Sequence, residues 1–479
     1  MRRVLTGEQM RYADNYTINE LGVPQNILME RAGSALAEEI IARFDKNQKI
    51  LFACGSGNNG GDGVIACDIL RKKGYNASKF FVTHSSTGVI YERYDVIVDC
   101  LLGTGLNKCV EGKYLECIKS INDSGAYVIS CDIASGLNAN NGKVMGVAVK
   151  PNLTICIGEL KTGLFFNDGV DYSGETVVKD IGISVWGDYP FIIEKDDIKH
   201  LFTNDKRNVH KGSFGKVCVV GGSKQFIGGS LLTQNALATI KTGTGYTAIC
   251  VPESLYSVYA GLVMESVMFT LKDSEGTFIF DSNGLDKIMD FAEVIAFGNG
   301  CGNTLGVYQN LKYLLQNYNG KMVIDADGLN VLATYGLDIL KDSNCQVILT
   351  PHIKEFSRLS GLTVEEITNN PLIVTDFANE YGVTVILKSA VSIVTDGVNV
   401  GINITGNQGM AKAGSGDVLC GITAGLFSKG EPFESAIASS YFFGRCGDIG
   451  AEKYSKTTLT ASEIIESMPR AINELNLND

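Results

Sequence analysis

The chain has 479 residues, 45% of them hydrophobic, and a formal net charge of -12 at pH 7. This acidic balance excludes a general electrostatic attraction to nucleic acid or to an anionic membrane surface. The length exceeds what one ordinary hydrophobic core occupies, so we expect two α/β domains.

The 13 cysteines are scattered between Cys54 and Cys446 and include no CxxC pair. This spacing predicts neither a zinc site nor a disulfide scaffold, and it favours reduced thiols in a cytoplasmic protein. The opening MRRVLTGEQM leads into polar sequence instead of the apolar core of a signal peptide. No stretch approaches the ~20 apolar residues that span a bilayer, so we expect no membrane partner.

The first strong pattern covers residues 25–44, where apolar side chains recur at spacings of three and four and predict an amphipathic helix. Short apolar runs follow, separated by helical patterns: KILFACG, SKFFVTH, YDVIVDCLLG, AYVISCDIASG and NLTICIGE. Runs of this kind are buried on both faces, which is typical of a largely parallel sheet.

The first of these runs leads into a glycine-rich loop, Gly55-Ser56-Gly57-Asn58-Asn59-Gly60-Gly61-Asp62-Gly63, and then into an apolar helical stretch. The GxGxxG spacing between a strand and a helix predicts backbone N–H groups that face a phosphate. A dinucleotide dehydrogenase would also carry an acidic residue at the end of the next strand. SKFFVTH offers none, which argues against that class.

Polar side chains that a phosphate turn does not require gather at three predicted strand ends. They are Asn58, Asn59 and Asp62 in the glycine-rich loop, Asp99 before LGTG, and Asp132 before ASG. Because ligands bind beyond the carboxyl ends of parallel strands, these loops are expected to converge on one crevice that holds a polar ligand or an ion. The alternative is that the aspartates only cap the turns or helices that follow them.

Residues 1–190 resemble the NAD(P)H-hydrate epimerase family through LTGEQMR, LGVPQNILMERAG, GSGNNGGDG, DCLLGTGL, CDIASGLNANNG and ELKTG. The resemblance implies a Rossmann-like three-layer α/β/α sandwich over residues 1–200. It also implies that the hydrated dinucleotide contacts Asp132 and two segments: Asn58, Asn59, Gly60, Gly61 and Asp62, and then Gly103, Thr104, Gly105, Leu106, Asn107, Lys108 and Cys109.

The same resemblance implies a potassium ion surrounded by Asn59, Asp99 and Ser135, with Asp132 as the catalytic acid/base. Amide, carboxylate and hydroxyl oxygens are hard donors that suit an alkali cation. Epimerisation at C6 of the hydrate requires proton transfer at its hydroxyl, which one positioned carboxylate can provide. Ala134 stands where the family usually has proline, so we expect a less rigid loop with activity retained.

The pattern breaks at residues 182–208, which contain the only tryptophan, so we expect a domain boundary near 195–205. A second series of apolar runs follows: GKVCVVGGS, YTAICVPE, VIAFGNG, KMVIDADG, QVILTPH, VTVILKSA and SIVTDG. Helical segments separate many of these runs, which predicts a second α/β domain over residues 201–479.

Near the end, Gly414-Ser415-Gly416-Asp417 precedes the apolar helical run VLCGITAGLF. A GSGD sequence at a helix start presents free N–H groups to phosphoryl oxygens and places a carboxylate beside the reacting hydroxyl. If Asp417 only capped the helix, the two glycines would be unexplained. The arrangement resembles ribokinase-type kinases, in which this aspartate is the base.

Further segments extend the resemblance over residues 200–475 to the NAD(P)H-hydrate dehydratase family, with its ribokinase-like α/β fold: HKGSFGK, GGS, DADGLN, TPHIKEF and KSA. The resemblance implies that the hydrated dinucleotide contacts Gly229, Gly302, His352 and Asp417. It implies that the AMP portion of the nucleotide is held by Lys388, Ser389, Ala390, Val391, Ser392 and Gly416.

Two of these residues have simpler interpretations, because His352 could be structural and Lys388 could be a solvated surface charge. Their positions at predicted strand ends favour a role in a site. The chain also departs from the family: Lys354 and Ser389 replace common glycines, Gln408 replaces a proline, and Asn299 and Cys301 lie in a loop usually written GPGLG. We expect these departures to alter nucleotide affinity without removing a catalytic group.

Together the resemblances imply a bifunctional enzyme of nicotinamide nucleotide repair. Its N-terminal domain would epimerise the R and S hydrates NADHX and NADPHX with K+. Its C-terminal domain would dehydrate the S epimer with Mg2+ while ADP becomes AMP and phosphate. ATP in place of ADP, and a preference between the two hydrates, stay open. The apolar N-terminal helix and the large core favour a homo-oligomer.

Two rival hypotheses remain. A ribokinase-like small-molecule kinase would release a stable phosphorylated product, whereas a dehydratase would release free phosphate and the restored cofactor. The N-terminal domain could also be a non-catalytic binding or interaction module, in which case replacing Asp132 would change no epimerisation rate.

Overall fold

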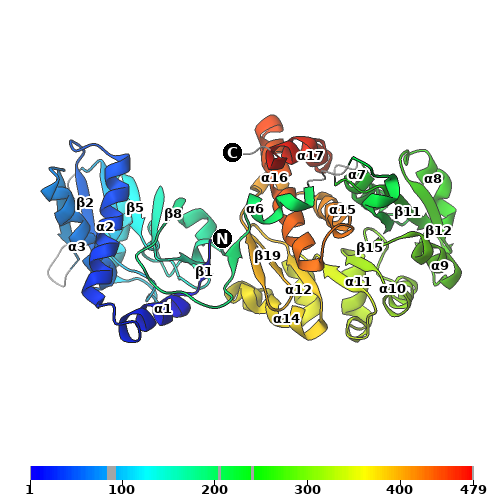
Figure 1. Ribbon diagram of the computed structural model, residues 1–479, viewed down its shortest axis with the longest axis horizontal. Coiled ribbons are helices and arrows are strands. Elements are labelled where there is room, and N and C mark those ends of the chain that lie inside the picture. The colour runs from blue at the N-terminus through cyan, green and yellow to red at the C-terminus, as the bar shows by residue number, and fades with distance from the viewer. Residues whose placement is uncertain (1, 83–92, 203–206, 239–241, 477–479) are drawn as a thin grey trace. The chain divides into compact units, whose positions relative to one another are not determined.

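The computed structural model describes residues 2–82, 93–202, 207–238 and 242–476. Its contacts form two compact units that separate between Phe191 and Ile192 (Figure 1). At this division, β9 (Phe191–Ile192) belongs to the sheet of the C-terminal unit. The Ile193 N–H, for example, donates to the Ile402 carbonyl at 3.0 Å.

The N-terminal unit is built on a six-stranded parallel sheet with the strand order β3-β2-β4-β5-β6-β8. Its strands are β2 (Ile50–Cys54), β3 (Ala77–Phe81), β4 (Val96–Cys100), β5 (Tyr127–Cys131), β6 (Leu153–Ile157) and β8 (Glu175–Lys179). Its helices are α1 (Gly7–Asn19), α2 (Gln25–Arg43), α3 (Asn58–Lys72), α4 (Gly112–Asn122) and α5 (Gly169–Tyr172). A separate parallel pair joins β1 (Val4–Leu5) to β7 (Leu160–Lys161).

The predicted parallel sheet is confirmed in this unit, and so is the helix expected over residues 25–44. Every residue of β2 and β4 is buried, as expected for central strands covered on both faces. Helices α2 and α3 pack against each other, and their apolar side chains share one core with β2, β4 and β6. In the run SKFFVTH, Thr83 and His84 lie outside the described residues.

The C-terminal unit contains a ten-stranded sheet with the order β12-β11-β10-β15-β16-β17-β18-β19-β20-β9. The new strands are β10 (Lys216–Val220), β11 (Tyr246–Pro252), β12 (Val267–Leu271), β15 (Val294–Phe297), β16 (Lys321–Ile324), β17 (Gln346–Leu349), β18 (Thr384–Leu387), β19 (Ser392–Thr395) and β20 (Val400–Asn403). The pairs from β12 to β18 are parallel, and those joining β18 to β19 and β19 to β20 are antiparallel.

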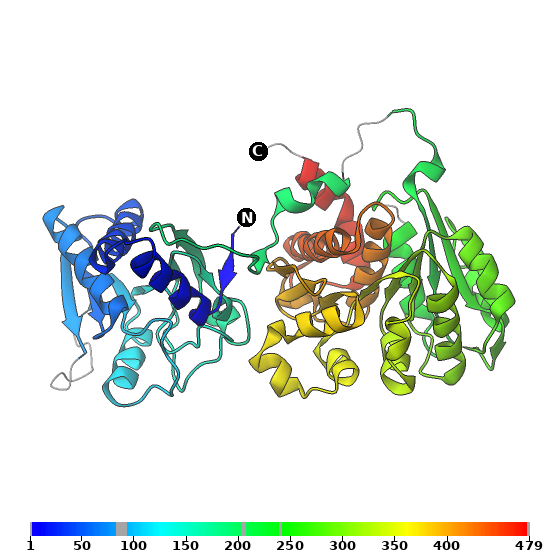
Figure 2. The same cartoon turned by 60° about the horizontal axis from the view of Figure 1, so that its bottom comes forward.

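The longer helices of this unit are α7 (Ile227–Ala238), α9 (Ser282–Phe291), α10 (Leu305–Asn317), α11 (Asp327–Tyr335), α12 (Ile353–Ser360), α14 (Val374–Tyr381), α15 (Ser415–Phe427), α16 (Pro432–Tyr454) and α17 (Ala461–Asn476). Shorter ones are α6 (Lys195–Ile198), α8 (Tyr256–Ala260) and α13 (Val364–Asn369), and β13 (Asp273–Ser274) pairs with β14 (Thr277–Phe278). Helices α15, α16 and α17, orange to red in Figure 2, pack against one another. Helix α15 also contacts α7, β15 and β16. Near its start, Asp417 accepts a hydrogen bond from Asn299, which follows β15.

Candidate active sites

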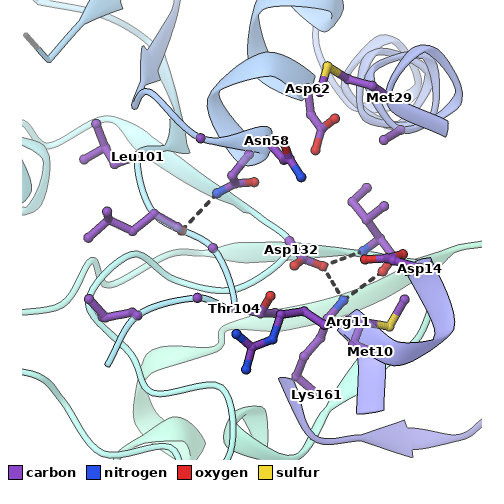
Figure 3. Close-up of a pocket in the computed structure, with 18 of the residues that line it drawn as sticks. Met10, Arg11, Asp14, Met29, Asn58, Asp62, Leu101, Thr104, Asp132 and Lys161 are labelled. Atoms are coloured by element: carbon purple, nitrogen blue, oxygen red, sulfur yellow. Dashed lines mark hydrogen bonds and ion pairs between the residues drawn. The ribbon is translucent and has the colours of Figure 1, made fainter. Parts of the chain in front are cut away.

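A cavity of about 910 Å³ opens in the N-terminal unit beyond the carboxyl ends of its strands. Helix α1, the start of α3, the loop after β4 and the end of β5 contribute to its lining (Figure 3). Of the residues expected to contact substrate, the lining includes Asn58, Asn59, Asp62, all of Gly103 to Cys109, and Asp132. The predicted convergence of three strand ends is therefore what the structure shows.

The glycine-rich loop places its polar residues in the first turns of α3, which begins at Asn58. Gly60 and Gly61 do not line the cavity. A Cβ on Gly60 would lie only 2.0 Å from the Gly55 carbonyl oxygen, and one on Gly55 only 1.9 Å from that of Leu101. These two glycines allow the loop to approach the segment after β4, which brings Asn59 toward that segment.

Asn59, which lines the cavity, forms one hydrogen-bonded cluster with the fully buried Asp99 and Ser135. The Ser135 hydroxyl donates to Asp99 Oδ1 at 2.6 Å, and the Ser135 N–H donates to Oδ2 at 2.9 Å. Asn59 Nδ2 donates to the Leu102 carbonyl at 2.9 Å, and that carbonyl also lies 3.1 Å from Ser135 Oγ. The structure thus brings together the three residues expected around potassium.

The cluster fits a cation by the chemistry of its donors. Asn59 Oδ1 is buried and accepts no hydrogen bond from the described residues, so it is an oxygen available to a ligand. Asp99 is fully buried, and burial raises the pKa of its carboxyl, although bonds from Ser135, Leu101 and Ser130 oppose that rise. An amide oxygen beside a buried carboxylate and a hydroxyl is an environment that an alkali cation would stabilise.

Asp132 follows β5 with a left-handed backbone conformation, φ +70, which aspartate tolerates better than most residues. Its N–H donates to the Ile155 carbonyl at 2.7 Å, and its Oδ1 accepts the Ile157 N–H at 3.1 Å. The same Oδ1 forms an ion pair with Lys161. One contact therefore holds the backbone and two hold the carboxylate, while the side chain still lines the cavity.

Lys161 was missed by the residue-level prediction, although it lies in the ELKTG segment. Its side chain is fully buried, and Nζ donates to Asp132 and, at 2.8 Å, to the Ile157 carbonyl. Burial disfavours the charged ammonium, but Asp132 outweighs that effect, so the pKa of Lys161 is raised. Because Lys161 follows an apolar run, the sequence could have indicated a buried lysine. It could not have indicated that Asp132 is its partner.

Two further carboxyls face the same cavity. Burial, together with the charges of Asp132 and Asp14, raises the pKa of Asp62 to about 8. Burial and the Asp132 charge raise the pKa of Asp14, on α1, to about 6. Figure 3 shows Asp14, Asp62 and Asp132 on three different elements around the cavity. A site with one paired carboxylate and two carboxyls of raised pKa is suited to acid/base chemistry. Asp14 was not predicted, because nothing in the polar sequence of α1 distinguishes it.

In the C-terminal unit, the GSGD segment begins α15 as predicted, with Gly414 in a left-handed conformation before Ser415. Ser415 Oγ is buried and has no hydrogen-bond partner among the described residues. The first N–H groups of a helix have no partner within the helix, and the Ser415 N–H donates instead to the Lys412 carbonyl at 3.3 Å.

Asp417 belongs to a buried polar network that spans three strand ends. Asn299 Nδ2 donates to Asp417 Oδ1 at 2.7 Å and to Asp325 Oδ2 at 3.2 Å. Lys388 Nζ donates to Asp325 Oδ1 at 2.8 Å and lies 4.0 Å from Glu355. Burial raises the pKa of Asp417 to about 6, against the hydrogen bond from Asn299. Lys388 is largely buried and paired, so the solvated-charge interpretation of Lys388 is wrong.

The other expected contacts lie around this network. A Cβ on Gly229 would be 3.4 Å from Asp417 Oδ1, and one on Gly416 would be 3.3 Å from Lys388 Nζ. The Gly302 N–H donates to Asp327 Oδ2 at 2.8 Å. In the turn between β18 and β19, Ser389 and Ala390 are exposed and Val391 is buried, and Ser392, the first residue of β19, is half-buried.

His352 is the N-cap of α12, where its Nδ1 accepts the Glu355 N–H at 3.1 Å and the Glu355 carboxylate accepts the His352 N–H at 2.8 Å. Its side chain is nonetheless 50% exposed, so a face of the ring is open to a ligand. Burial and the charge of Lys388 lower the pKa of His352. The capping role and a binding role are compatible.

The departures from the family pattern differ in their surroundings. Ala134 and Cys301 are fully buried, whereas Lys354 and Gln408 are exposed.

No group of three or more His, Cys, Asp or Glu residues suited to a metal ion occurs among the described residues, and all 13 cysteines are unpaired. Within the described ranges, no helix is long and apolar enough to cross a membrane.

Comparisons with known proteins match both units. Residues 217–470 match the NAD(P)H-hydrate dehydratase family, and residues 25–89 and 77–163 match the family described as YjeF-related protein N-terminus. The chain is 30% identical to the bifunctional NAD(P)H-hydrate repair enzyme Nnr of Thermofilum pendens, over 99% of this chain and 97% of that protein. It is 31% identical to the enzyme of the same name from Dictyoglomus turgidum, over 99% of both.

Solved structures resemble the C-terminal unit. An ADP/ATP-dependent NAD(P)H-hydrate dehydratase of Bacillus subtilis, crystallised with ATP and Mg2+, matches 60% of this chain and 98% of its own with a TM-score of 0.51 and 23% identity. A ribokinase-like superfamily protein of Enterococcus faecalis matches 61% of this chain and 98% of its own with a TM-score of 0.51 and 24% identity. These likenesses confirm the predicted ribokinase-like fold.

Proposed function

The chain belongs to the family of bifunctional NAD(P)H-hydrate repair enzymes, and from this premise we propose that it restores hydrated nicotinamide cofactors in two steps. Residues 1–200 interconvert the R and S epimers of NADHX and NADPHX. Residues 201–479 dehydrate the S epimer to the reduced cofactor while ADP is converted to AMP and phosphate. The two steps are complementary, because a chiral phosphoryl-transfer site accepts one epimer and hydration produces both.

In the epimerase step, Asp132 accepts the proton of the C6 hydroxyl while the C6–N1 bond breaks to give an aldehyde, and N1 takes up a proton from a protonated carboxyl of the cavity. N1 then loses that proton and attacks the other face of the aldehyde, and Asp132 returns its proton to the oxygen. Support comes from its position on the cavity, where Lys161 and the Ile157 N–H orient the carboxylate. The pKa of Asp62, raised to about 8, keeps this carboxyl protonated near neutral pH, and Asp14, whose pKa is raised to about 6, titrates just below it. The substrate contacts Asn58 to Asp62 and Gly103 to Cys109, most of which line that cavity.

Potassium is held by Asn59, Asp99 and Ser135 in this proposal. When bound, the ion would supply a positive charge that offsets the buried Asp99 carboxylate. The support is the unpartnered Asn59 oxygen and the buried oxygen donors around it.

In the dehydratase step, Asp417 accepts the proton of the C6 hydroxyl of the S hydrate, and the hydroxyl oxygen attacks the terminal phosphoryl group of ADP. The bond between that phosphorus and the AMP oxygen breaks, and the start of α15 stabilises the developing charge. The ring nitrogen lone pair then expels phosphate from C6. Loss of a proton from C5 restores the C5–C6 double bond.

Binding roles in the dehydratase follow the same proposal: the hydrate contacts Gly229, Gly302, His352 and Asp417, and the AMP portion contacts Lys388 to Ser392 and Gly416. Mg2+ would enter with the nucleotide and neutralise its phosphates. The described residues present no dedicated acidic cluster for this ion, so no step is assigned to it. We propose that the dehydratase uses ADP as its phosphoryl donor in preference to ATP.

Thirteen unpaired cysteines support action in the reducing cytoplasm, and association into a homo-oligomer is part of the proposal.

The observation that carries the whole proposal is the coexistence, in one chain, of the Asp132 cavity and the Asp417 network. The test supplies the full-length chain with a mixture of R and S hydrates, Mg2+, K+ and either ADP or ATP. Full recovery of the reduced-nicotinamide absorbance, with free phosphate, is expected. A stable phosphorylated product would instead identify a kinase.

A further inference from the structure

Asn299 lies between two carboxylates in the C-terminal unit. Its Nδ2 donates to Asp417 Oδ1 at 2.7 Å and to Asp325 Oδ2 at 3.2 Å, so both amide hydrogens are used. The residue is fully buried. Asp417 Oδ2 accepts no hydrogen bond from the described residues, so one carboxylate oxygen is fixed and the other is available.

The backbone around Asn299 leaves its side chain little choice of position. The flanking Gly298 and Gly300 adopt left-handed conformations with φ +125 and +75. The Asn299 carbonyl accepts the Gly222 N–H at 2.9 Å, and a Cβ on Gly221 would lie 2.7 Å from that carbonyl oxygen. The loop is therefore packed tightly against the segment after β10. This packing fixes the backbone from which the Asn299 side chain extends.

The amide orientation follows from charge. With Oδ1 and Nδ2 exchanged, an amide oxygen would face two carboxylates at hydrogen-bonding distance, which is repulsive. In the observed orientation Oδ1 is buried without a hydrogen-bond partner among the described residues. An unsatisfied buried oxygen is costly, so the residue is best explained by what its two N–H groups do.

The charges that face Asp417 come from several elements. Asp325 and Asp327 lie at the end of β16 and the start of α11, and Lys388 follows β18. Helix α7, which packs against α15, carries no titratable side chain, and Cys420 lies one turn along α15 itself. Burial and the two aspartates raise the pKa of Asp417, whereas Asn299 and Lys388 oppose the rise.

We propose that Asn299 is a positioning residue for the dehydratase base: its amide orients the Asp417 carboxylate and favours the ionised form that accepts the substrate proton. This inference rests on the proposed dehydratase function. In the loop pattern GPGLG, to which residues 298–302 are similar, the matching position is proline, which has no side-chain donor, so the contact belongs to this chain's own residues.

The test compares the full-length wild type with Asn299→Ala and with the isosteric Asn299→Asp, which replaces the donor by a third carboxyl. Asn303→Ala, in the same loop but exposed, is the matched control. Initial dehydration rates of the S hydrate are measured from about pH 5.5 to 9 at saturating nucleotide, and nucleotide affinity is measured by calorimetry. We expect both Asn299 variants to lose on the order of tenfold in kcat at neutral pH.

The acidic limb of the plot of kcat against pH distinguishes a positioning role of Asn299 from a merely structural one. It should move to higher pH in both Asn299 variants, with nucleotide affinity changed less than about twofold, while Asn303→Ala behaves as wild type. An equal loss at every pH, or an unmoved profile in whichever variant folds, would overturn the inference while leaving the dehydratase intact. If the wild type itself restored no cofactor, the proposed function would fail, and the inference with it.

Discussion

Lys161 and Asp132 form an ion pair at the epimerase cavity in which the lysine side chain is fully buried and the carboxylate remains 17% exposed. The pair is asymmetric: both residues line the cavity, but only the Asp132 side chain is partly exposed, whereas Lys161 Nζ donates to Asp132 and to the Ile157 carbonyl. Lys161 therefore fixes the carboxylate in place from the protein side.

Replacing Lys161 by Met should lower epimerisation about 100-fold, because Asp132 loses the cation that orients it. Breaking a buried pair also leaves one unpaired charge, so the free energy of unfolding should fall by about 3 kcal/mol. Urea unfolding followed by fluorescence measures this loss in the N-terminal unit, since the only tryptophan, Trp186, packs against Tyr16 there. The exposed Lys119→Met is the control and should change neither quantity.

Asp62 should make the N-terminal unit less stable as the pH rises. Its pKa is about 8 in the folded protein, above its ordinary value of 3.8, so between these two values the folded state binds more protons than the unfolded state. Stability therefore decreases with rising pH across this window. Asp62→Asn should remove most of this slope and stabilise the unit at pH 9 by on the order of a few kcal/mol.

Urea unfolding at about pH 5, 7 and 9 checks this prediction, with the exposed Asp123→Asn as control. Parallel slopes for wild type and Asp62→Asn would show that Asp62 is ionised throughout, which would remove its proposed role as a proton-holding group.

Potassium should stabilise the N-terminal unit through Asn59. At a concentration ten times its dissociation constant, an ion that binds only the folded state adds about 1.4 kcal/mol. Thermal unfolding of the wild type in K+ against a bulky organic cation should show this increase, together with faster epimerisation. Asn59→Ala should lose both effects. A K+ effect of equal size in this variant would place the ion elsewhere.

Asp417→Asn should lower dehydration about 1000-fold, because the C6 hydroxyl then has no base, while nucleotide affinity stays close to that of the wild type. Epimerisation should be unchanged, since the substitution lies in the other unit. Measuring both activities in the same preparation checks the claim. A parallel loss of epimerisation would indicate global unfolding instead of a lost base.

Contacts between residues close in sequence were predictable. The glycine-rich loop and the GSGD helix start each combine turn, helix and ligand features within about a dozen residues, and alternating apolar runs sufficed to predict two largely parallel sheets. The convergence of Asp62, Asp99 and Asp132 was also predictable, because parallel strands end at a common edge.

Pairings between distant side chains were not predictable. Asp132 meets Lys161 across 29 positions and Asn299 meets Asp417 across 118, so each depends on packing that no local pattern encodes. The proton affinities of Asp14 and Asp62 depend on burial in a shared cavity, which only the folded chain reveals. The pairing of β9 with β20, far along the chain, is of the same kind.

The most direct test of the two-step account uses the pure R hydrate, which a stereospecific dehydratase does not accept. Given this epimer with ADP, Mg2+ and K+, the wild type should restore the reduced cofactor faster than spontaneous epimerisation allows. Asp132→Asn and Asp417→Asn should each fail alone and recover the activity when mixed. Recovery by Asp132→Asn at the wild-type rate would contradict the account, because the N-terminal unit would then contribute no epimerase.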